Sequence, residues 1–457
     1  MSSNGRNLCA TRRIYCPMQD RMRYFGTDGI RGVYGEELTD GLAMLAGNAL
    51  GRAADGGRVI LGRDTRTSGE NLARALAEGI LAGGGCVTDL GVVTTPCVAF
   101  VTRMTGAAAG VMISASHNPP RYNGIKIFDG EGKKLSEERE REIEAHIAGA
   151  KLCYAAVRGE LLPPCGEKEE YIRAVCERTG SLKGLTVALD CALGAAGALA
   201  PEIFSRLGAK VNTFFSSPDG AHINEGCGAL HPDVIAAQTV RTGADIGLCF
   251  DGDADRVIAS DEKGGVTDGD KILCVLARDR LQKGALPFSA AVGTLHTNLG
   301  AEAAMNETGI SLVRTDIGDH NVTRCMCENG YILGGEQSGH IIVGDFLPTG
   351  DGVFAGATLA AVVRSSGRPL SELADITLFP QSNADVVTEK KSAICADERL
   401  LAYVSAIRDM MGQSGRIMLR PSGTEPKIRI MAESKDAFLA SFAARSIELF
   451  IRTTLVP

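Results

Sequence analysis

The sequence predicts an α/β protein made of three similar domains and a separate last domain. Three observations predict it. At 457 residues the chain is too long for one hydrophobic core, and its length suits about three domains. A unit of strand, polar turn, helix, glycine-rich stop and strand recurs three times along the chain. A break in composition near residues 379–382 then separates the last part of the chain.

The first copy of this recurring unit begins with an apolar strand expected at 58–64. Ser68 can cap the helix that follows, in which Leu72, Leu76 and Ile80 recur at helical spacing. Three glycines end this helix, and a second strand is expected near 85–92. The second and third copies begin with strands expected at 185–190 and 290–295, and their helices end near 207–208 and 308–309.

The composition is that of an ordinary globular protein and excludes several classes of function. Hydrophobic residues make up 44% and charged residues 23% of the chain, so each domain can bury a core. The net charge of −7 argues against general binding to nucleic acid or to an anionic membrane. No uncharged apolar stretch reaches about 18 residues, so a transmembrane span is not expected. Because the chain has no Trp, a sugar would be held by hydrogen bonds rather than by stacked rings.

The cysteines and the N-terminal segment bear on the cellular location. The 14 cysteines are scattered and form no Cys-x-x-Cys pair, so neither a zinc site nor a disulfide framework is expected. We interpret them as small hydrophobic residues in a reducing cytoplasm. Residues 1–22 carry several arginines but lack the apolar segment of a secretory signal, and they are expected to be a disordered leader.

The stretch from Gly110 to Pro120 holds the strongest candidate for a reactive group. Residues 110–113 are expected to end a buried strand, and two serines, a histidine, an asparagine and a proline pair follow. Ligands bind at the carboxyl ends of strands in an open α/β sheet, so Ser116 is the predicted reactive residue. If strand geometry persists, the side chain of His117 points to the opposite side from Ser116.

A second buried strand is followed by three carboxylates. Asp251, Asp253 and Asp255 stand two residues apart and repel one another unless a cation binds. Oxygen ligands of this kind select Mg²⁺ or Ca²⁺ over zinc. Glu262 falls at the twelfth position of a calcium-binding hand, but the chain returns to a strand at 257–258, which argues against that hand. A solvated acidic turn is the competing structural interpretation.

Two cationic residues are candidates for a role beside Ser116. Arg31 is part of a glycine-rich turn expected at 24–32, whose backbone amides are open to an anion. Lys126 lies in an otherwise apolar strand that follows the Ser116 stretch across a predicted hairpin. The competing interpretations are a surface loop for Arg31 and a solvent-facing strand residue for Lys126.

Two polar loops in the second half of the chain suit a phosphorylated sugar. The loop at 333–340 offers a carboxylate, an amide, a hydroxyl and an imidazole to sugar hydroxyls, and its candidates are Glu336, Ser338 and His340. The turn at 419–430 combines hydroxyls, free amides and cations, which are the groups that bind phosphate. Its candidates are Arg420, Ser422, Gly423, Thr424 and Arg429. Taken with the reactive serine and the carboxylates, these loops predict phosphoryl transfer on a phosphosugar.

Five motifs in order resemble those of the α-D-phosphohexomutases: GTDGIRG, SASHNP, DGDADR, GGEQSGH and RPSGTEP. The resemblance runs from about residue 23 to the C-terminus and is greatest to the branch that acts on glucosamine phosphates. It implies three α/β domains with mixed sheets around a central cleft, and a smaller α+β C-terminal domain that can close it. The expected domains are 23–160 with the phosphoserine loop, 161–262 with the metal-binding loop, 263–380 with the sugar-binding loop and 381–457 with the phosphate-binding loop.

The resemblance also implies an activity and a role for each candidate. Glucosamine 6-phosphate and glucosamine 1-phosphate would be interconverted through a phosphoserine at Ser116 and a sugar bisphosphate, with a sugar 1,6-bisphosphate as activator. Mg²⁺ would be held by the phosphate on Ser116 together with the three aspartates. The loop at 333–340 would bind the sugar hydroxyls, and the turn at 419–430 the phosphate that is not transferred. Three cations would stabilise charge or move protons near the serine: Lys126, Arg31 and Arg256.

Several alternatives stay open. The glucosamine branch usually has Gly-Asp-Arg where this chain has Gly318, Asp319 and His320, so a phosphomannomutase/phosphoglucomutase is the first alternative. The second is a metal-dependent sugar phosphatase that uses Ser116 as a transient acceptor, and the third is a phosphosugar-binding protein without activity. The expected partners are small phosphosugars rather than nucleic acid or membrane, and a homodimer is allowed.

Overall fold

The structure is a computed structural model that describes residues 22–26, 28–149, 158–422 and 425–456. The expected disordered leader lies almost entirely outside the described residues. The chain forms two compact units, Met22–Thr377 and Leu378–Pro457. Across the described ranges, no helix is both long and apolar enough to cross a membrane.

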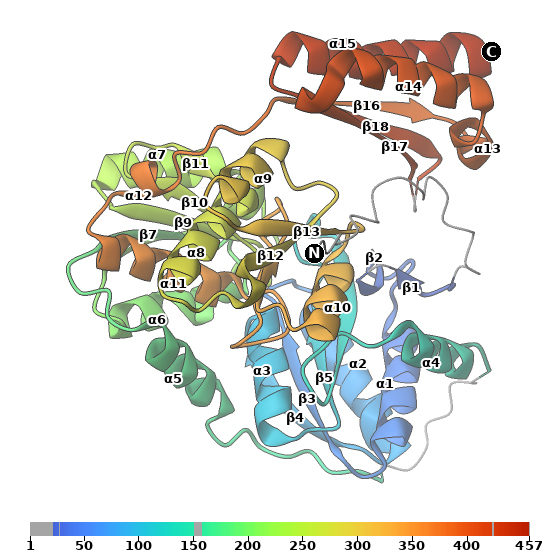
Figure 1. The fold of residues 1–457 in the computed structure, drawn as a ribbon. Coiled ribbons are helices and arrows are strands. Elements are labelled where there is room, and N and C mark those ends of the chain that lie inside the picture. Colours follow the sequence, from blue (N-terminus) through green and yellow to red (C-terminus); the bar gives the residue numbers. More distant parts are fainter. Residues whose placement is uncertain (1–21, 27, 150–157, 423–424, 457) are drawn as a thin grey trace, which may run out of the picture. The chain divides into compact units, whose positions relative to one another are not determined.

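The first sheet comes from the part of the chain coloured blue to teal in Figure 1, and its six strands have the order β1-β2-β6-β5-β3-β4. β3 is parallel to β4 and β5, whereas β6 is antiparallel to β5 and β2. The strands are β1 (Phe25–Gly26), β2 (Gly29–Val33), β3 (Arg58–Arg63), β4 (Cys86–Val92), β5 (Ala109–Ile113) and β6 (Tyr122–Asp129). The helices of this part are α1 (Asp40–Ala54), α2 (Gly69–Gly83), α3 (Thr95–Thr105) and α4 (Glu137–Gly149).

The second sheet has the order β11-β10-β9-β7-β8 and the third has the order β13-β12-β14-β15. The second sheet and its helices are α5 (Glu167–Thr179), β7 (Thr186–Asp190), α6 (Ala200–Arg206), β8 (Lys210–Phe214), α7 (Pro232–Thr242), β9 (Ile246–Phe250), β10 (Val257–Asp261) and β11 (Val266–Thr267). The third sheet and the helices around it are α8 (Gly269–Gln282), β12 (Ala290–Thr294), α9 (Leu299–Asn306), β13 (Ser311–Thr315), α10 (Asp319–Asn329), β14 (Leu333–Gly335), β15 (Ile341–Val343), α11 (Gly352–Ser366) and α12 (Leu370–Leu373).

The three sheets share one plan. A central strand, β3, β7 or β12, is parallel to both of its neighbours. One neighbour, β5, β9 or β14, then turns back into an antiparallel hairpin with β6, β10 or β15. The recurring unit predicted from the sequence begins at these three central strands, which confirms the repetition and the mixed sheets. The hairpin loops are 114–121, 251–256 and 336–340, so three of the motifs occupy the same place in three related sheets.

One local expectation about the first domain is wrong. Ser68 precedes α2, but its side chain makes no hydrogen bond to the helix. Its Oγ instead accepts a hydrogen bond from Nδ2 of Asn123 at 2.9 Å. Asn123 is fully buried on β6, and a buried amide without a partner costs more free energy than an uncapped helix.

The C-terminal unit is a smaller α+β domain, as expected. Its sheet is antiparallel throughout, in the order β16-β18-β17, with β16 (Gln381–Val387), β17 (Gly415–Pro421) and β18 (Lys427–Ser434). Its helices are α13 (Lys391–Cys395), α14 (Glu398–Met411) and α15 (Ala437–Phe450). Ile428 and Ile430 of β18 are buried against Leu400 of α14 and Ile447 of α15, and this core is the domain's own.

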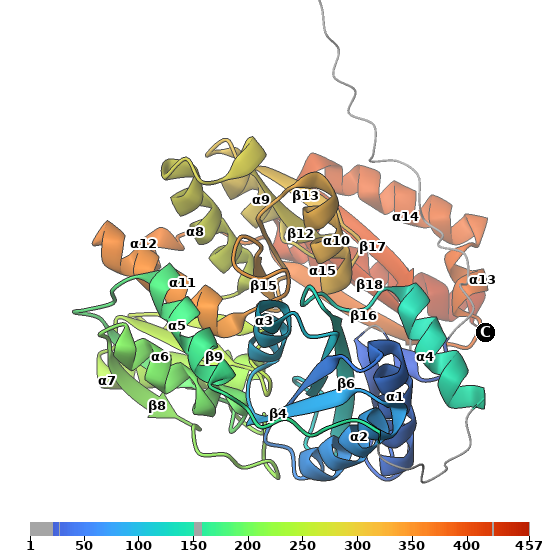
Figure 2. The ribbon, with the colours of Figure 1, turned by 90° about the horizontal axis from the view of Figure 1, so that it is seen from below.

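A buried tyrosine and aspartate join α5 to α11, two helices that lie side by side (Figure 2). The hydroxyl of Tyr171 donates to Oδ2 of Asp351 at 3.0 Å. Asp351 also caps α11, since its Oδ1 accepts from the backbone N–H of Phe354 at 2.9 Å. Burial raises the pKa of the Asp351 carboxyl to about 7, although these hydrogen bonds lower it.

Replacing Asp351 with asparagine is expected to change how stability depends on pH. A carboxyl whose pKa is higher in the folded than in the unfolded chain favours folding at low pH, and this contribution is lost as pH rises to about 7. Asparagine keeps the oxygen acceptor but does not titrate. Between pH 5 and pH 8 the parent should therefore lose about 3 kcal/mol of unfolding free energy relative to Asp351→Asn, measured by urea unfolding. The same pH dependence in both proteins would contradict the raised pKa.

Candidate active site

Ser116 lies in the hairpin loop between β5 and β6, where the chain leaves the strand after Ile113. Its backbone has a positive φ of 52°, a conformation that side chains disfavour, and the residue is 1% exposed. The hydroxyl of Ser114 accepts a hydrogen bond from the N–H of Ser116 at 2.8 Å. The hydroxyl of Ser116 donates to Oδ2 of Asp251 at 2.5 Å. The structure therefore brings the predicted reactive serine against the first aspartate of the DGDADR motif.

The expected orientation of His117 is wrong. Its Nδ1 lies 3.2 Å from Oγ of Ser116, on the same side. Strand alternation does not apply, because β5 ends at Ile113 and the positive φ of Ser116 turns the chain. Burial lowers the pKa of the His117 imidazole to about 4, with further lowering from Arg256 and Arg31. The ring is therefore uncharged at neutral pH.

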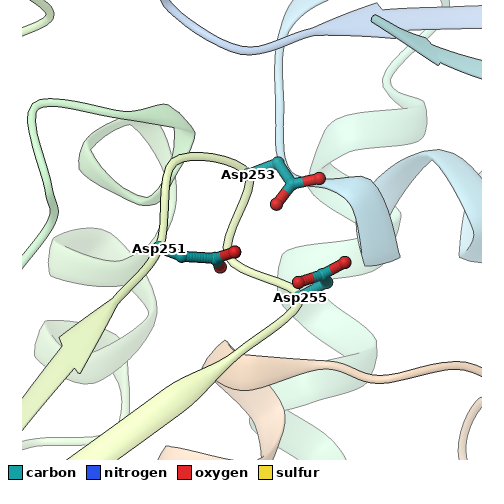
Figure 3. A group of neighbouring side chains, drawn as sticks. All are labelled: Asp251, Asp253 and Asp255. Atoms are coloured by element: carbon teal, nitrogen blue, oxygen red, sulfur yellow. The ribbon is translucent and has the colours of Figure 1, made fainter. Parts of the chain in front are cut away.

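Three carboxylates gather on one side of the loop between β9 and β10 (Figure 3). Asp251, Asp253 and Asp255 are buried, and one oxygen of each lies within 4.8 Å of the others. Oδ2 of Asp253 accepts from the Thr95 hydroxyl at 2.6 Å, but its Oδ1 is buried and accepts no hydrogen bond from any described residue. An unpartnered buried oxygen in a set of three carboxylates fits a hard divalent cation. The alternative of a solvated acidic turn is wrong, because these side chains do not face solvent.

Burial and mutual repulsion set the protonation of these aspartates. The pKa of Asp251 lies well above its usual value because of burial and then because of the charges of Asp255 and Asp253. Burial raises the pKa of Asp255, but Lys126, His340 and Arg256 together outweigh burial and hold this pKa well below its usual value. A bound divalent cation would relieve the repulsion that disfavours charge on Asp251.

Lys126 is the cation at the centre of the site. Its Nζ lies 2.7 Å from Oδ2 of Asp253, 2.8 Å from Oδ2 of Asp255 and 3.4 Å from Oδ2 of Asp28. The side chain is 1% exposed, so the interpretation as a solvent-facing strand residue is wrong. Burial lowers the pKa of this ammonium, but the three carboxylates outweigh burial and hold the pKa well above its usual value. Lys126 is therefore charged at neutral pH.

The contacts of Lys126 continue into a closed circuit of charged groups. Asp28 pairs with Lys134, and Lys134 pairs with Asp319. Nε2 of His340 lies 3.4 Å from Asp319 and accepts the N–H of Gly350 at 3.1 Å, while its Nδ1 lies 3.9 Å from Asp255. The members of the circuit, in order, are Asp255, Lys126, Asp28, Lys134, Asp319 and His340. The circuit links β6 and the hairpin loops of the second and third sheets through the ion pairs of the two lysines and the contacts of the His340 imidazole.

The two predicted arginines lie near these groups. Arg31 pairs with Asp28, three residues before it. Nε of Arg256 lies 3.9 Å from Oδ1 of Asp255, and Arg256 is partly exposed. Both guanidinium groups lower the pKa of His117, whose Nδ1 lies 3.2 Å from Oγ of Ser116.

All three hairpin loops contribute to one cavity of about 180 Å³, which supports the expected cleft. His117 comes from the first loop, Asp251 and Arg256 from the second, and Gln337 and Ser338 from the third. The other lining residues are Ala229, Leu230, Pro232, Ile258, Val266 and Asp268. The cavity is therefore lined both by polar side chains from the three loops and by five apolar residues from the part of the chain that forms the second sheet.

The other two predicted residues of the third loop differ in exposure, since Glu336 is half-buried and His340 is buried. Oε1 of Glu336 accepts the backbone N–H of Gly318 at 3.1 Å. His340 is 3% exposed and contacts Asp255 and Gly350, as described above. A role for either residue in binding the sugar stays a prediction.

The predicted phosphate-binding turn belongs to the C-terminal unit and lies between β17 and β18. Arg420 and Arg429 are directly opposed in this pair of strands. Burial, and then the charge of Arg429, lowers the pKa of Arg420. Ser422 is buried, and its carbonyl accepts from Nζ of Lys391 at 2.6 Å. Gly423 and Thr424 lie outside the described residues, so their predicted role has no structural counterpart.

Sequence reasoning missed several polar residues of the site. Asp64 and Arg66 follow β3 directly and are buried beneath the Ser116 loop. Asn224, from the second domain, donates to the carbonyl of Ser116 at 2.9 Å. The signal for Asp64 and Arg66 was the same as for Ser116, namely polar residues at the carboxyl end of a buried strand. Asn224 follows no motif, and only the fold reveals it.

Comparison with known proteins supports what the geometry indicates. Four family models match in order: Phosphoglucomutase/phosphomannomutase, alpha/beta/alpha domain I over 22–152, domain II over 169–265, domain III over 268–378 and the C-terminal domain over 383–445. A phosphoglucosamine mutase of Bacillus cereus (strain ATCC 10987 / NRS 248) is 45% identical over 90% of this chain and 94% of its own length. This chain belongs to the phosphoglucomutase/phosphomannomutase family. It is accordingly a phosphosugar mutase, as the motifs implied.

Solved structures of the family share the fold. A phosphoglucomutase/phosphomannomutase family protein from Burkholderia thailandensis superposes with a TM-score of 0.81 at 25% identity, covering 96% of this chain and 99% of that one. An N-acetylphosphoglucosamine mutase from Aspergillus fumigatus, in complex with GlcNAc-6P and magnesium, has a TM-score of 0.67 at 17% identity and covers 94% of this chain and 96% of that one. At this low identity the second likeness shows the fold alone.

Proposed function

We propose that this chain interconverts glucosamine 6-phosphate and glucosamine 1-phosphate. The observation that carries the chemistry is the contact between the Ser116 hydroxyl and Asp251, beside a cavity lined by Gln337 and Ser338. The substrate is inferred from the relatives, since the protein that is 45% identical is named a phosphoglucosamine mutase.

In this proposal the working form carries a phosphate on Oγ of Ser116. A sugar hydroxyl attacks the phosphorus, the bond to Oγ breaks, and the proton of the sugar hydroxyl ends on Oγ. The resulting sugar bisphosphate then returns its other phosphate to Ser116, and the isomerised monophosphate leaves. Lys126 is charged, so it stabilises the negative charge of the transferring group instead of acting as a base. Arg31 and Arg256 add positive charge from the side of His117.

The three aspartates would hold Mg²⁺ together with the phosphate on Ser116. When bound, the metal neutralises charge on the transferring phosphoryl group. The oxygen-only donor set and the unpartnered Oδ1 of Asp253 support a hard cation at this site. Mg²⁺ in preference to Ca²⁺ is part of the proposal.

Binding of the rest of the substrate is divided among the domains. We assign the sugar hydroxyls to Glu336, Ser338 and His340 in the domain proposed at 263–380. The domain proposed at 381–457 would hold the phosphate that is not transferred, and the opposed Arg420 and Arg429 support this because an anion between them would relieve their repulsion. Ser422, Gly423 and Thr424 complete that set. The phosphoserine loop belongs to 23–160 and the metal loop to 161–262.

A panel of substrates tests the proposal. We expect kcat/KM for glucosamine 6-phosphate to exceed that for glucose 6-phosphate and mannose 6-phosphate by about 100-fold, because buried polar groups reject a substrate that leaves them unpaired. Faster turnover of mannose or glucose phosphates would support a phosphomannomutase/phosphoglucomutase. Release of inorganic phosphate without isomerised sugar would support a phosphatase.

His320 is the residue that favours the first alternative, and the same panel can test it. It stands in place of the usual arginine, and its Nδ1 is buried without a hydrogen-bond partner in the described part of the chain. If it sets the sugar preference, His320→Arg should change the ratio of kcat/KM values between sugars. An unchanged ratio would show that the sugar is chosen elsewhere.

The cellular setting and assembly are also proposals. The cysteines of the described part are all free, which supports a reducing cytoplasm. A homodimer is proposed on the family resemblance, and a sugar 1,6-bisphosphate is the proposed activator. The homodimer is tested by measuring the mass of the protein in solution. The activator is tested by looking for a lag in the reaction when no bisphosphate is added.

A further inference from the structure

The guanidinium group of Arg66 lies beneath the Ser116 loop and is fully hydrogen-bonded. Its side chain is 0% exposed. Nη2 donates to the carbonyls of Ser116 at 2.9 Å and Asn118 at 2.7 Å, and Nη1 donates to those of Pro119 at 2.7 Å and Tyr122 at 2.9 Å. With the bond from Nε to Asp64, all five N–H donors of one arginine are used. Three of them hold this loop, and a fourth holds Tyr122, where β6 begins.

Asp64 holds both Arg66 and Ser114, which is the first residue of the loop. Its Oδ2 accepts from Nε of Arg66 at 3.0 Å and from the hydroxyl of Ser114 at 2.6 Å, and its Oδ1 accepts the backbone N–H of Arg66 at 2.9 Å. The Ser114 hydroxyl in turn accepts the N–H of Ser116. Both the N–H and the carbonyl of Ser116 are thus held, directly or through Ser114, by one buried ion pair.

The second domain holds the same carbonyl. Nδ2 of Asn224 donates to the carbonyl oxygen of Ser116 at 2.9 Å and lies 3.5 Å from that of Asn118. Gly252, inside the DGDADR motif, lies so close that a Cβ there would be 2.7 Å from the Ser116 carbonyl oxygen and 3.1 Å from Nδ2 of Asn224. The Ser116 carbonyl therefore accepts two strong hydrogen bonds, one from each of two domains.

We propose that Arg66, Asp64 and Asn224 position Ser116 for phosphoryl transfer. They hold its carbonyl so that the left-handed backbone conformation persists and Oγ faces Asp251. Without these donors the residue would relax toward a negative φ, since a side chain at positive φ costs of the order of 1 kcal/mol. An error of 1 Å in placing a reacting group can cost about 100-fold in rate. This inference rests on the proposed role of Ser116, and the three residues contact no reacting atom.

The test compares Asn224→Ala and Arg66→Lys with the parent enzyme. Lysine keeps the charge beside Asp64 but cannot make the five-bond fork. For both variants we expect kcat to fall about 10- to 100-fold while KM for the phosphosugar stays within about twofold. Phosphorylation of dephosphorylated Ser116 by a sugar 1,6-bisphosphate, followed by intact mass in a single turnover, should slow by the same factor.

Thr239→Ala is the matched control for loss of stability. Thr239 is buried in the same domain as Asn224, and its hydroxyl donates to the carbonyl of Ile235 at 2.8 Å, away from the loop. We expect it to lower the unfolding free energy by about as much as Asn224→Ala and to leave kcat unchanged. In Arg66→Ala, if it folds, added guanidinium should recover part of kcat, because it can reoccupy the vacated site.

The outcomes separate this inference from the proposed function. If Ser116→Ala is inactive but Asn224→Ala and Arg66→Lys retain full kcat, the positioning role is wrong and the proposed function stands. A fall of kcat in Thr239→Ala equal to that in Asn224→Ala would also overturn the positioning role, because it would reflect stability alone. If Ser116→Ala turns over normally, Ser116 is not the phosphate carrier, and the proposed mechanism fails together with this inference.

Discussion

Replacing Ser116 with alanine is expected to reduce turnover of the phosphosugar by roughly 10³-fold or more, because the proposed carrier of the phosphate is removed. The reason is geometric, since its hydroxyl is the one that reaches Asp251 from the first hairpin loop. After incubation with a sugar 1,6-bisphosphate, the parent should gain one phosphate by intact mass and Ser116→Ala should gain none. The coupled assay and the mass measurement together check the prediction.

Folding must be monitored in the same experiment. Ser116→Ala loses the hydrogen bond to Asp251 but keeps the Ser116 backbone carbonyl that accepts from Arg66. Its unfolding free energy should therefore change by only about 1 kcal/mol. Ser136→Ala is a suitable control, because Ser136 precedes α4 and lies on the surface. Normal turnover of Ser116→Ala would show that another group accepts the phosphate.

Replacing Lys126 with methionine is expected to have the largest effect on stability. Its ammonium lies within 2.8 Å of Asp253 and Asp255, and within 3.4 Å of Asp28. Removing one partner of a buried ion pair leaves uncompensated charge and costs about 3–5 kcal/mol. We therefore expect a loss of this size in the unfolding free energy, measured by urea with a chelator present, and a loss of turnover.

Added metal should recover much of that loss. Without Lys126 the carboxylates lack their internal counter-charge, so a divalent cation should stabilise Lys126→Met more than it stabilises the parent. Titrating Mg²⁺ and Ca²⁺ separately, with the thermal midpoint as readout, identifies the cation without an activity assay. Equal stabilisation of parent and variant would contradict a metal site at the three aspartates.

Lys134→Met is the matched control for Lys126→Met. Lys134 also pairs with Asp28, but its side chain is 19% exposed and its second partner is Asp319, outside the metal loop. Removing the Lys134 ammonium should lower the unfolding free energy by about 1 kcal/mol. The shift of the thermal midpoint on adding Mg²⁺ should stay as it is in the parent. A response to metal that changes as much as in Lys126→Met would place the cation elsewhere in the charged circuit.

Local sequence determined the order of elements and where polar residues interrupt them. Apolar runs ending in Ser114 and Asp251 marked two strand ends, and the repeat beginning near residues 58, 185 and 290 marked the central strands of three sheets. These features depend on neighbours in the chain, on periodicity and on the choice of turn residues, all of which the sequence displays.

Only the tertiary structure decided which side chains meet. Asp251, which accepts from the Ser116 hydroxyl, and Asp253 and Asp255, which pair with Lys126, lie more than 100 residues away along the chain. A single backbone angle at Ser116 reversed the expected side of His117. That angle is held by Arg66 and Asn224, whose contacts no local pattern displays. Side-chain direction in a loop is set by long-range hydrogen bonds, whereas the position of the loop is set by the strand before it. For this reason the sequence could place the reactive serine but not its orientation or its supports.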